Sequence, residues 1–264
     1  MNIVICIKQV PDTTDIRINP DDNTLIRAGV VSIINPFDMY AIEEGLRLRD
    51  RFEGKVTVVT MGPPQAEAAL REAISLGCDQ GVLLSDRAFA GSDTLATSYA
   101  LAMGIKKLGD IDVIICGKQA IDGDTAQVGP GISVWLDMPQ ATYVKKIEEV
   151  KEAKGKKTFR LERMVEEGHE ILEIPLPCVL TVVKEINEPR MPSLKGMMRA
   201  KKAEIIKWTA EDVKADEKKI GLNGSPTQVV KIFSPPSRVG GQVLHGDPED
   251  VVTKLRELLK GEIN

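Results

Sequence analysis

The first half of the chain alternates short, continuously hydrophobic runs with longer stretches whose hydrophobic residues recur at helical spacing. The runs at 3–7, 56–61, 82–84 and 113–116 are typical of strands that are buried on both faces of a sheet. The helical stretches lie between these runs, so strands and helices follow one another in a β-α-β order. This order predicts an α/β fold with a mostly parallel, doubly wound sheet and helices on both of its faces.

Proline and small polar residues predict where the helices begin. Asn35 precedes Pro36, which favours a helix start with Asn35 as the N-cap. The prolines at 63–64 open a second helix, and Ser92 or Asp93 caps a third. Each of these starts follows a hydrophobic run, as the predicted fold requires.

After Pro139 the pattern changes to strands joined by turns rich in lysine, glutamate and glycine. The segments 142–149, 157–164 and 170–183 read as strands, and we expect them to form an antiparallel addition at the edge of the sheet. Two prolines within 187–192 exclude a regular element there. We expect the remainder to be an extended arm, and a last helix with a hydrophobic face follows Pro248.

Composition narrows the class of protein. The chain has 35 basic and 39 acidic residues and a net charge of −4, which argues against a nucleic-acid binder. No hydrophobic run approaches the roughly 20 residues that a membrane span needs, so no membrane association is expected. The first residues have neither a basic start nor a small-residue cleavage site. We therefore expect a cytoplasmic protein.

Cysteine and histidine usage predicts no metal site. The four cysteines are far apart in the sequence and form no Cys-x-x-Cys pair. Cys6, Cys116 and Cys178 lie in or beside hydrophobic runs, where cysteine behaves as a small buried side chain. His169 and His245 keep no ligand spacing with any cysteine.

The loop at 117–130 is the first candidate for a binding site. In an open parallel sheet, ligands bind beyond the carboxyl ends of the strands, where the strand order reverses. The loop runs from a predicted strand into a predicted helix, which Asp124 or Thr125 can cap. Free amides around 126–128 would then suit a phosphate group, although a capped turn without a ligand has the same pattern.

Charged residues in the neighbouring loops extend this candidate site. Lys118 adds positive charge, while Asp122 and Asp124 suit ribose hydroxyls or backbone groups better than phosphate. Lys8 follows the first strand and lies either beside a base or in a plain turn. The segment 87–94 offers a cation, an aromatic ring and a second helix start, as a solvated loop also would.

Familiar catalytic patterns are absent from the sequence. No Gly-x-Gly-x-x-Gly follows the first strand, and the chain has no Walker-type lysine loop. Nor does it offer a nucleophile, base and orienting group for hydrolysis, so we predict no catalytic residue. A redox function would therefore depend on a bound cofactor.

Several motifs resemble those of one family. The segments 117–122, 35–38 and 187–190, together with 170–172 followed by 177–181, resemble the beta subunit of electron-transfer flavoproteins. The resemblance covers essentially the whole chain in consistent order. It implies a heterodimer with a larger alpha subunit that carries FAD.

In ordinary members the beta subunit holds a structural AMP. The resemblance places its contacts on Cys6, Asn35, Pro36, Phe37, Asp38, Met61, Gly117, Lys118, Gln119, Asp122, Gly123, Asp124, Thr125, Ala126, Gln127 and Val128.

The resemblance also implies a recognition loop that docks a partner dehydrogenase. Leu194 would be the docking residue, with Pro189 and Arg190 beside it. The chain thus divides into an adenine-nucleotide or FAD-binding α/β domain at 1–185, a recognition loop at 186–205, and a C-terminal arm with an anchor helix at 206–264.

One departure from the ordinary members concerns the run at 122–130. This run, with the segment 87–91, resembles the electron-bifurcating branch, in which the beta subunit binds a second FAD and meets NADH. Gly123 lets the backbone approach a ligand closely. The longer ligand needs a diphosphate contact, for which we expect Arg87 and the helix start at Ser92, Asp93 and Thr94.

The resulting hypothesis is a redox subunit that performs no catalysis alone. NADH would donate a hydride, and the electrons would be split between ferredoxin and a flavin dehydrogenase of the acyl-CoA or lactate dehydrogenase type, or combined in reverse. One alternative is a beta subunit with AMP and no NADH chemistry. Another is a nucleotide-binding regulatory or stress-type α/β protein.

Overall fold

The computed structural model describes residues 1–12, 32–153, 155–230, 241 and 243–262. The chain divides into two compact units. The first comprises 1–17 and 26–230, and the second 18–25 and 231–264. The described part of the second unit contains the helix α6 (Pro248–Glu262), which confirms the last predicted helix. The extended arm expected over 206–264 is wrong for residues 206–230, which belong to the first unit, while residues 231–240 and 242 lie outside the described residues.

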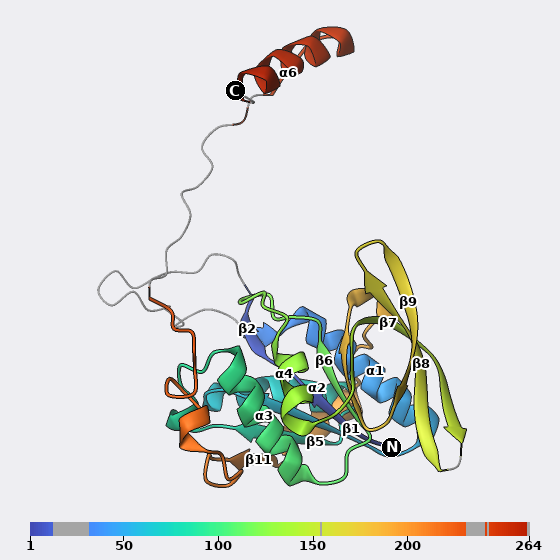
Figure 1. Ribbon diagram of the computed structural model, residues 1–264, viewed down its shortest axis with the longest axis vertical. Helices are drawn as coiled ribbons and strands as arrows, with labels where there is room; N and C mark the ends of the chain where they lie inside the picture. Colours follow the sequence, from blue (N-terminus) through green and yellow to red (C-terminus); the bar gives the residue numbers. More distant parts are fainter. Residues whose placement is uncertain (13–31, 154, 231–240, 242, 263–264) are drawn as a thin grey trace. The chain divides into compact units, whose positions relative to one another are not determined.

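The first unit is built on a nine-stranded sheet with the order β11-β5-β4-β1-β6-β10-β7-β8-β9 (Figure 1). Neighbouring strands from β11 to β7 pair in parallel, and β7, β8 and β9 pair antiparallel. The expected α/β fold with an antiparallel edge is thereby confirmed. The strands are β1 (Asn2–Cys6), β4 (Lys55–Met61), β5 (Gln80–Leu84), β6 (Val113–Gly117), β7 (Gln140–Ala153), β8 (Lys156–Val165), β9 (Gly168–Pro175), β10 (Cys178–Val182) and β11 (Ile205–Trp208). A separate antiparallel pair joins β2 (Gln9–Pro11) and β3 (Ser32–Ile34).

Helices cover the sheet on both sides. Along β1, Ile3 and Ile5 point into one hydrophobic cluster, whereas Val4 and Cys6 point into the other, because alternate side chains of a strand face opposite ways. The first cluster lies under α1 (Pro36–Phe52), α2 (Glu67–Leu76) and α5 (Leu194–Lys202), and the second under α3 (Thr94–Leu108) and α4 (Val128–Leu136). Short 3-10 turns are η1 (Pro64–Ala66), η2 (Arg87–Phe89), η3 (Lys184–Ile186) and η4 (Glu217–Lys219).

The structure corrects one predicted strand. The segment 170–183 is not a single edge strand, because β9 ends at Pro175 and β10 begins at Cys178. Pro177 has no amide hydrogen to donate and interrupts the ladder. All five residues of β10 are buried, and the strand lies between β6 and β7, parallel to both. A continuously buried run suits such a central position better than an edge.

The chain that follows α5 also returns to the sheet. The residues of β11 pair in parallel with β5, and Ala210, Val213 and Ile220 then pack in the cluster beneath α3. Sequence periodicity predicts only an irregular arm here. The boundaries at 185 and 205 stay a prediction.

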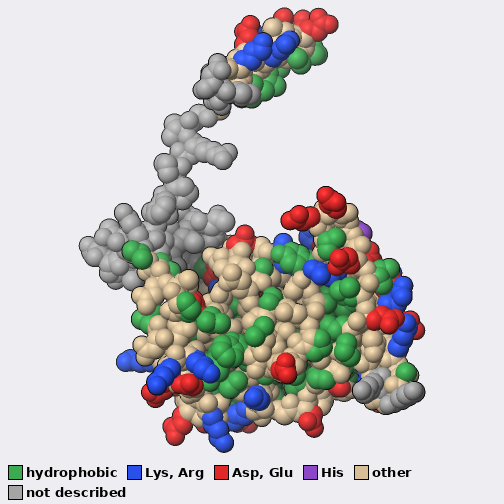
Figure 2. All heavy atoms as spheres, viewed as in Figure 1, with side chains coloured by type: hydrophobic (Ala, Val, Ile, Leu, Met, Phe, Trp, Pro, Cys, Tyr) green, Lys and Arg blue, Asp and Glu red, His purple; other side chains and the backbone are tan. Residues whose placement is uncertain are grey.

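The cysteines are buried, and the charged side chains are unevenly distributed over the surface. All four cysteines are buried and unpaired, and the described residues contain no cluster of potential metal ligands. Within the same residues, no helix is both long and apolar enough to cross a bilayer. Figure 2 shows few charged side chains over the middle of the face formed by α3 and α4, and more towards the β8–β9 edge.

Candidate functional site

The strand order reverses between β1 and β6. From β1 the chain first builds outward through β4 and β5, and later returns to the other side of β1 through β6. The carboxyl ends of β1 and β6 therefore flank the crevice where ligands bind in sheets of this kind. Most of the predicted contact residues lie in the loops that leave these two strands or at the start of α1.

Asp38 joins the ends of both strands. Its Oδ2 accepts a hydrogen bond from the backbone amide of Lys8 at 2.7 Å, and its Oδ1 accepts one from that of Gly117 at 3.2 Å. The residue is only 6% exposed. Burial raises the pKa of Asp38 to about 7, although these hydrogen bonds act in the opposite direction. Asp38 thus holds the two strand ends together as a titratable group.

Asn35 holds the loop that follows β6. Its side chain is fully buried, donates to the carbonyl of Gln119 at 2.8 Å and accepts from the amide of Ile121 at 3.0 Å. Its own amide donates to the carbonyl of Lys8 at 2.8 Å. Asn35 is the N-cap residue of α1, as predicted, but its side chain bonds to this loop and not to the first amides of the helix.

Gly117 permits the close approach of β6 to the start of α1. A Cβ atom at this position would lie 2.6 Å from the backbone carbon of Phe37 and 2.8 Å from the amide nitrogen of Asp38. Both neighbours are backbone atoms that cannot move aside without disturbing α1. The site therefore requires glycine for a packing reason that does not depend on any ligand.

The two lysines of the site have different surroundings. Lys8 Nζ lies 2.7 Å from Asp122 Oδ1, so this carboxylate neutralises it. Lys118 Nζ forms no ion pair with any described residue and lies over two aromatic rings, 5.4 Å from Phe37 and 5.3 Å from Tyr143. Among the described residues, the Lys118 ammonium thus has aromatic neighbours but no carboxylate partner.

The start of α4 differs from the prediction. The helix begins at Val128, and neither Asp124 nor Thr125 caps it. Asp124 instead contacts the side chain of Gln119, and both Asp124 and Ala126 have left-handed backbone conformations. The amides that were expected to form a helix start at 126 therefore belong to an irregular turn.

The second predicted contact region adjoins the first. Thr94 Oγ1 donates a 2.7 Å hydrogen bond to Gln127 Oε1, which ties the start of α3 to the loop before α4. Gly123 has open space where a Cβ would project. The start of α3 and the loop before α4 are consequently in direct contact.

Ser92 and Asp93 have other partners. Asp93 caps α3 as predicted, through the amides of Leu95 and Ala96, and it also accepts two hydrogen bonds from Thr227. Ser92 accepts a hydrogen bond from the amide of Gly221. These side chains fix the chain at 221–227 against α3, a contact that no sequence pattern indicated.

The remaining predicted residues lie around this region. Arg87 is exposed on η2 and has no ion-pair partner among the described residues. Cys6 pairs in register with Cys116 and both are buried, while Met61 ends β4 half-buried. Pro36 opens α1. Arg87 and Met61 thus remain apart from the hydrogen-bonded loops.

Sequence reasoning missed Tyr143. Its backbone is left-handed, with a φ of 58°, and its amide donates to Thr181 Oγ1 at 3.1 Å. Left-handed conformations are unusual for bulky residues and mark positions held by their surroundings. No local pattern in the sequence signals this conformation, since its cause is the irregular pairing of β7 with β10.

Comparison with known proteins identifies the family. A family model described as "Electron transfer flavoprotein domain" matches residues 22–213. The chain is also 51% identical to the electron transfer flavoprotein subunit beta of Thermoanaerobacterium thermosaccharolyticum, over 98% of both chains. The chain belongs to the electron-transfer flavoprotein family. It is a subunit of the beta type, as the sequence motifs had indicated.

Two further relatives of this electron-transfer flavoprotein subunit carry other names. Protein FixA of Bradyrhizobium diazoefficiens is 50% identical over 90% of this chain and 84% of its own length. The Caffeyl-CoA reductase-Etf complex subunit CarD of Acetobacterium woodii is 48% identical over 97% of this chain and 98% of its own. The family assignment replaces the hypothesis of a regulatory or stress-type protein.

Proposed function

We propose that this electron-transfer flavoprotein beta subunit binds FAD at the β1–β6 crevice and accepts electrons from NADH. The observation that carries the proposal is the hydrogen bond between Thr94 and Gln127, which joins the two regions that a dinucleotide would need. The open space at Gly123 and the unpaired ammonium of Lys118 also suit a phosphate-bearing ligand. AMP remains the alternative, since it would need only the first region.

FAD, when bound there, supplies the hydride and single-electron chemistry that no side chain of this chain offers. The chain's own residues bind and orient the cofactor. Asn35 and Asp38 hold the loop and strand ends, and Lys118 offers positive charge. Arg87 is exposed on η2 and would have to reach towards the crevice to contact the diphosphate. The complex would divide the electrons between ferredoxin and a flavin dehydrogenase, or combine them in reverse.

The alpha subunit is the first partner. The face formed by α3 and α4 has few charged side chains, and Val134 of α4 and Leu95 of α3 are exposed hydrophobic residues on those helices (Figure 2). Interface cores are depleted in charge in the same way. We propose this face as part of the contact with the alpha subunit.

The second partner is a flavin dehydrogenase of the acyl-CoA or lactate dehydrogenase type. The segment 187–202 exposes Met191, Leu194 and Met198, at 86%, 78% and 64% exposure. Exposed hydrophobic side chains on a structured segment suit docking into an apolar pocket. The name of the relative CarD, which belongs to a caffeyl-CoA reductase complex, also supports assembly with a reductase.

Anaerobic NADH titration tests this function. NADH added to the purified complex of this chain with its alpha subunit should bleach the visible flavin absorbance. The Arg87→Ala variant should lose flavin from this subunit, and with it most of the bleaching. Arg51→Ala is the matched control, because Arg51 is exposed at the far end of α1. Wild-type complex that NADH leaves fully oxidised would favour the AMP alternative.

A further inference from the structure

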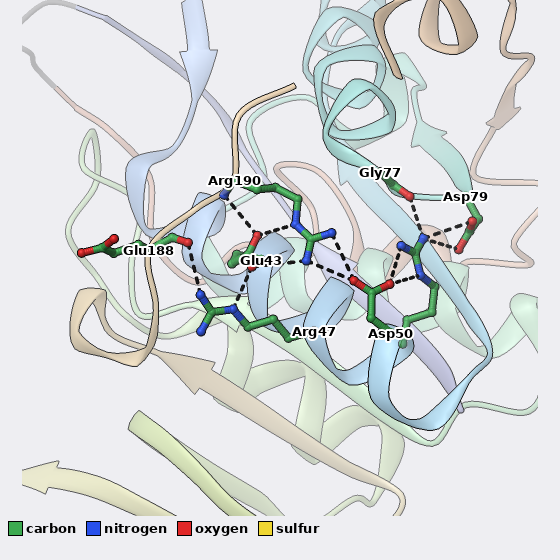
Figure 3. Close-up of polar contacts among 8 residues, drawn as sticks. Glu43, Arg47, Asp50, Gly77, Asp79, Glu188 and Arg190 are labelled. Atoms are coloured by element: carbon green, nitrogen blue, oxygen red, sulfur yellow. Dashed lines mark hydrogen bonds and ion pairs between the residues drawn. The ribbon is translucent and has the colours of Figure 1, made fainter. Parts of the chain in front are cut away.

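Arg190 lies in the proposed docking segment, yet its side chain turns back onto α1 (Figure 3). It reaches residues 147 and 140 positions away in the sequence, Glu43 and Asp50. Sequence motifs had placed it beside Leu194 as a docking contact. In the structure the Arg190 side chain instead bonds to α1.

Glu43 fixes both the backbone and the side chain of Arg190. Its Oε2 accepts from the Arg190 amide at 3.1 Å and from Nε at 2.8 Å. The Glu43 side chain is only 5% exposed. Burial by itself raises the pKa of Glu43, but hydrogen bonds from Arg190 and Arg47 outweigh it and lower the pKa. Glu43 therefore stays ionised and holds the arginine at neutral pH.

The contact belongs to a balanced cluster of charges along α1. Arg190 also donates to Asp50 Oδ2, with both distances 3.2 Å, and Arg49 donates to the other oxygen of Asp50 at 2.9 Å. Arg49 continues to the carbonyl of Gly77 and to Asp79. We call this set the arginine cluster; its members are Glu43, Arg47, Arg49, Asp50, Asp79 and Arg190.

Within the described chain, Arg190 is the main link between the arginine cluster and the docking segment. Arg47 reaches the segment through a single longer hydrogen bond, 3.4 Å, to the carbonyl of Glu188. Arg49 bonds to α1 and to the turn at 77–79. Removing Arg49 thus removes the same charge without releasing the segment.

A second set of contacts holds the helix that follows. Arg199 donates to the carbonyls of Ile74 and Cys78 at 2.9 and 2.8 Å, and Arg71 donates to that of Ala200 at 2.7 Å. These bonds fix α5 on α2. At the other end of the segment, Asn187 donates to the carbonyl of Tyr40 and to Glu44, each at 3.0 Å. Arg190 is the last side chain bonded to α1 before Met191 and the start of α5.

We propose that Arg190 is a positioning residue, which holds Met191 and the chain leading into Leu194, the first residue of α5, in a single arrangement for the partner without contacting the partner itself. The inference rests on the proposed docking function of this segment. A segment that is ordered before binding loses less entropy on docking. If release of Arg190 leaves about one molecule in ten competent, the apparent affinity for the partner falls roughly tenfold.

Amide hydrogen exchange on the heterodimer measures the positioning directly. Arg190→Ala should speed exchange of the amides at 190–197 by roughly tenfold, because the local opening free energy falls. Arg49→Ala should leave these amides unchanged, even if it lowers the melting temperature as much. The double variant Glu43→Gln with Arg190→Ala leaves no unpaired buried carboxylate, and it should behave as Arg190→Ala does. Unchanged exchange in both Arg190 variants would overturn the proposal.

Steady-state kinetics then separates positioning from contact. An acyl-CoA dehydrogenase that reduces the wild-type heterodimer serves as the probe. Arg190→Ala should raise KM for the heterodimer roughly tenfold with kcat almost unchanged, and Arg190→Lys should recover part of the loss. A fall in kcat at constant KM would contradict the proposal.

Leu194→Ala distinguishes failure of the inference from failure of the docking function. If Leu194→Ala raises KM and Arg190→Ala does not, the docking surface stands and the positioning role is wrong. If Leu194→Ala leaves KM unchanged, the segment is not the docking surface, and Arg190 has no partner to position.

Discussion

The β1–β6 crevice and the proposed docking segment, residues 187–202, are both held to α1, but by different chemistry. At the crevice, Asn35 and Asp38 bond to backbone groups of two loops and are almost completely buried. At the docking segment, Arg190 bonds to Glu43 and Asp50, and the Arg190 side chain is 35% exposed. One helix thus supports both regions, the first at its start by buried hydrogen bonds and the second further along by charge pairs.

This difference predicts which changes should destabilise each region. Buried groups without partners carry a large penalty, so the crevice should tolerate almost no change in side-chain shape. Partly exposed ion pairs contribute little and are screened by salt. The docking segment should consequently respond to solution conditions that leave the crevice unchanged.

The largest expected effect is a pH dependence at Asp38. Its folded pKa of about 7 lies above the ordinary value of 3.8, so folding favours the protonated form. This stabilisation is complete below the ordinary value and is lost as pH rises through about 7. The rise in the pKa of Asp38 corresponds to about 4 kcal/mol in the free energy of unfolding.

Urea unfolding of wild type and Asp38→Asn between pH 4 and 8 measures this dependence. The wild-type free energy of unfolding should fall relative to that of the variant as the pH rises, because the asparagine side chain of the variant does not titrate. A difference between the two proteins that stays constant across this range would show that Asp38 is ionised throughout.

The next effect concerns Asn35. Asn35→Ala leaves the Gln119 carbonyl and the Ile121 amide without their partner, which should cost about 2–4 kcal/mol. Denaturant unfolding gives the loss, and nucleotide content should fall with it. Arg190→Ala is the comparison and should lower the melting temperature without changing nucleotide content. Equal nucleotide loss in both variants would mean that the two regions are not held independently.

The smallest effect is that of salt. Raising sodium chloride from about 0.05 to 1 M shortens the screening length from roughly 14 to 3 Å and should weaken the Arg190 contacts by less than about 1 kcal/mol. Amides at 190–197 should then exchange a few times faster, whereas those at 117–121 should not. Faster exchange at 117–121 with no change at 190–197 would contradict the prediction that salt weakens only the Arg190 contacts.

Much of the fold was predictable because buried strands and helix starts leave local patterns. The continuously apolar runs indicated the parallel strands, and Pro36 marked the start of α1. The order of strands beyond β6 was not predictable in the same way. Residues 178–182 look like the continuation of an edge strand, and only pairing with β6 shows their central place.

The candidate site was predicted in outline for the same reason. Its loops follow strand ends, whereas the side chains within them are arranged by distant contacts. Asn35 has the sequence position of an N-cap, but its side chain bonds to a loop residue 84 positions away. Arg190 has the sequence position of an exposed docking residue, but in the structure it pairs with Glu43. Side-chain partners far apart in sequence leave no local pattern to read.

The nucleotide content of the heterodimer tests the central claim most directly. The purified complex of this chain with its alpha subunit is denatured, and FAD and AMP are separated by chromatography and quantified. The account predicts two FAD per heterodimer and no AMP, with one FAD released from this subunit. One FAD and one AMP per heterodimer would contradict it and assign the β1–β6 crevice to a structural nucleotide.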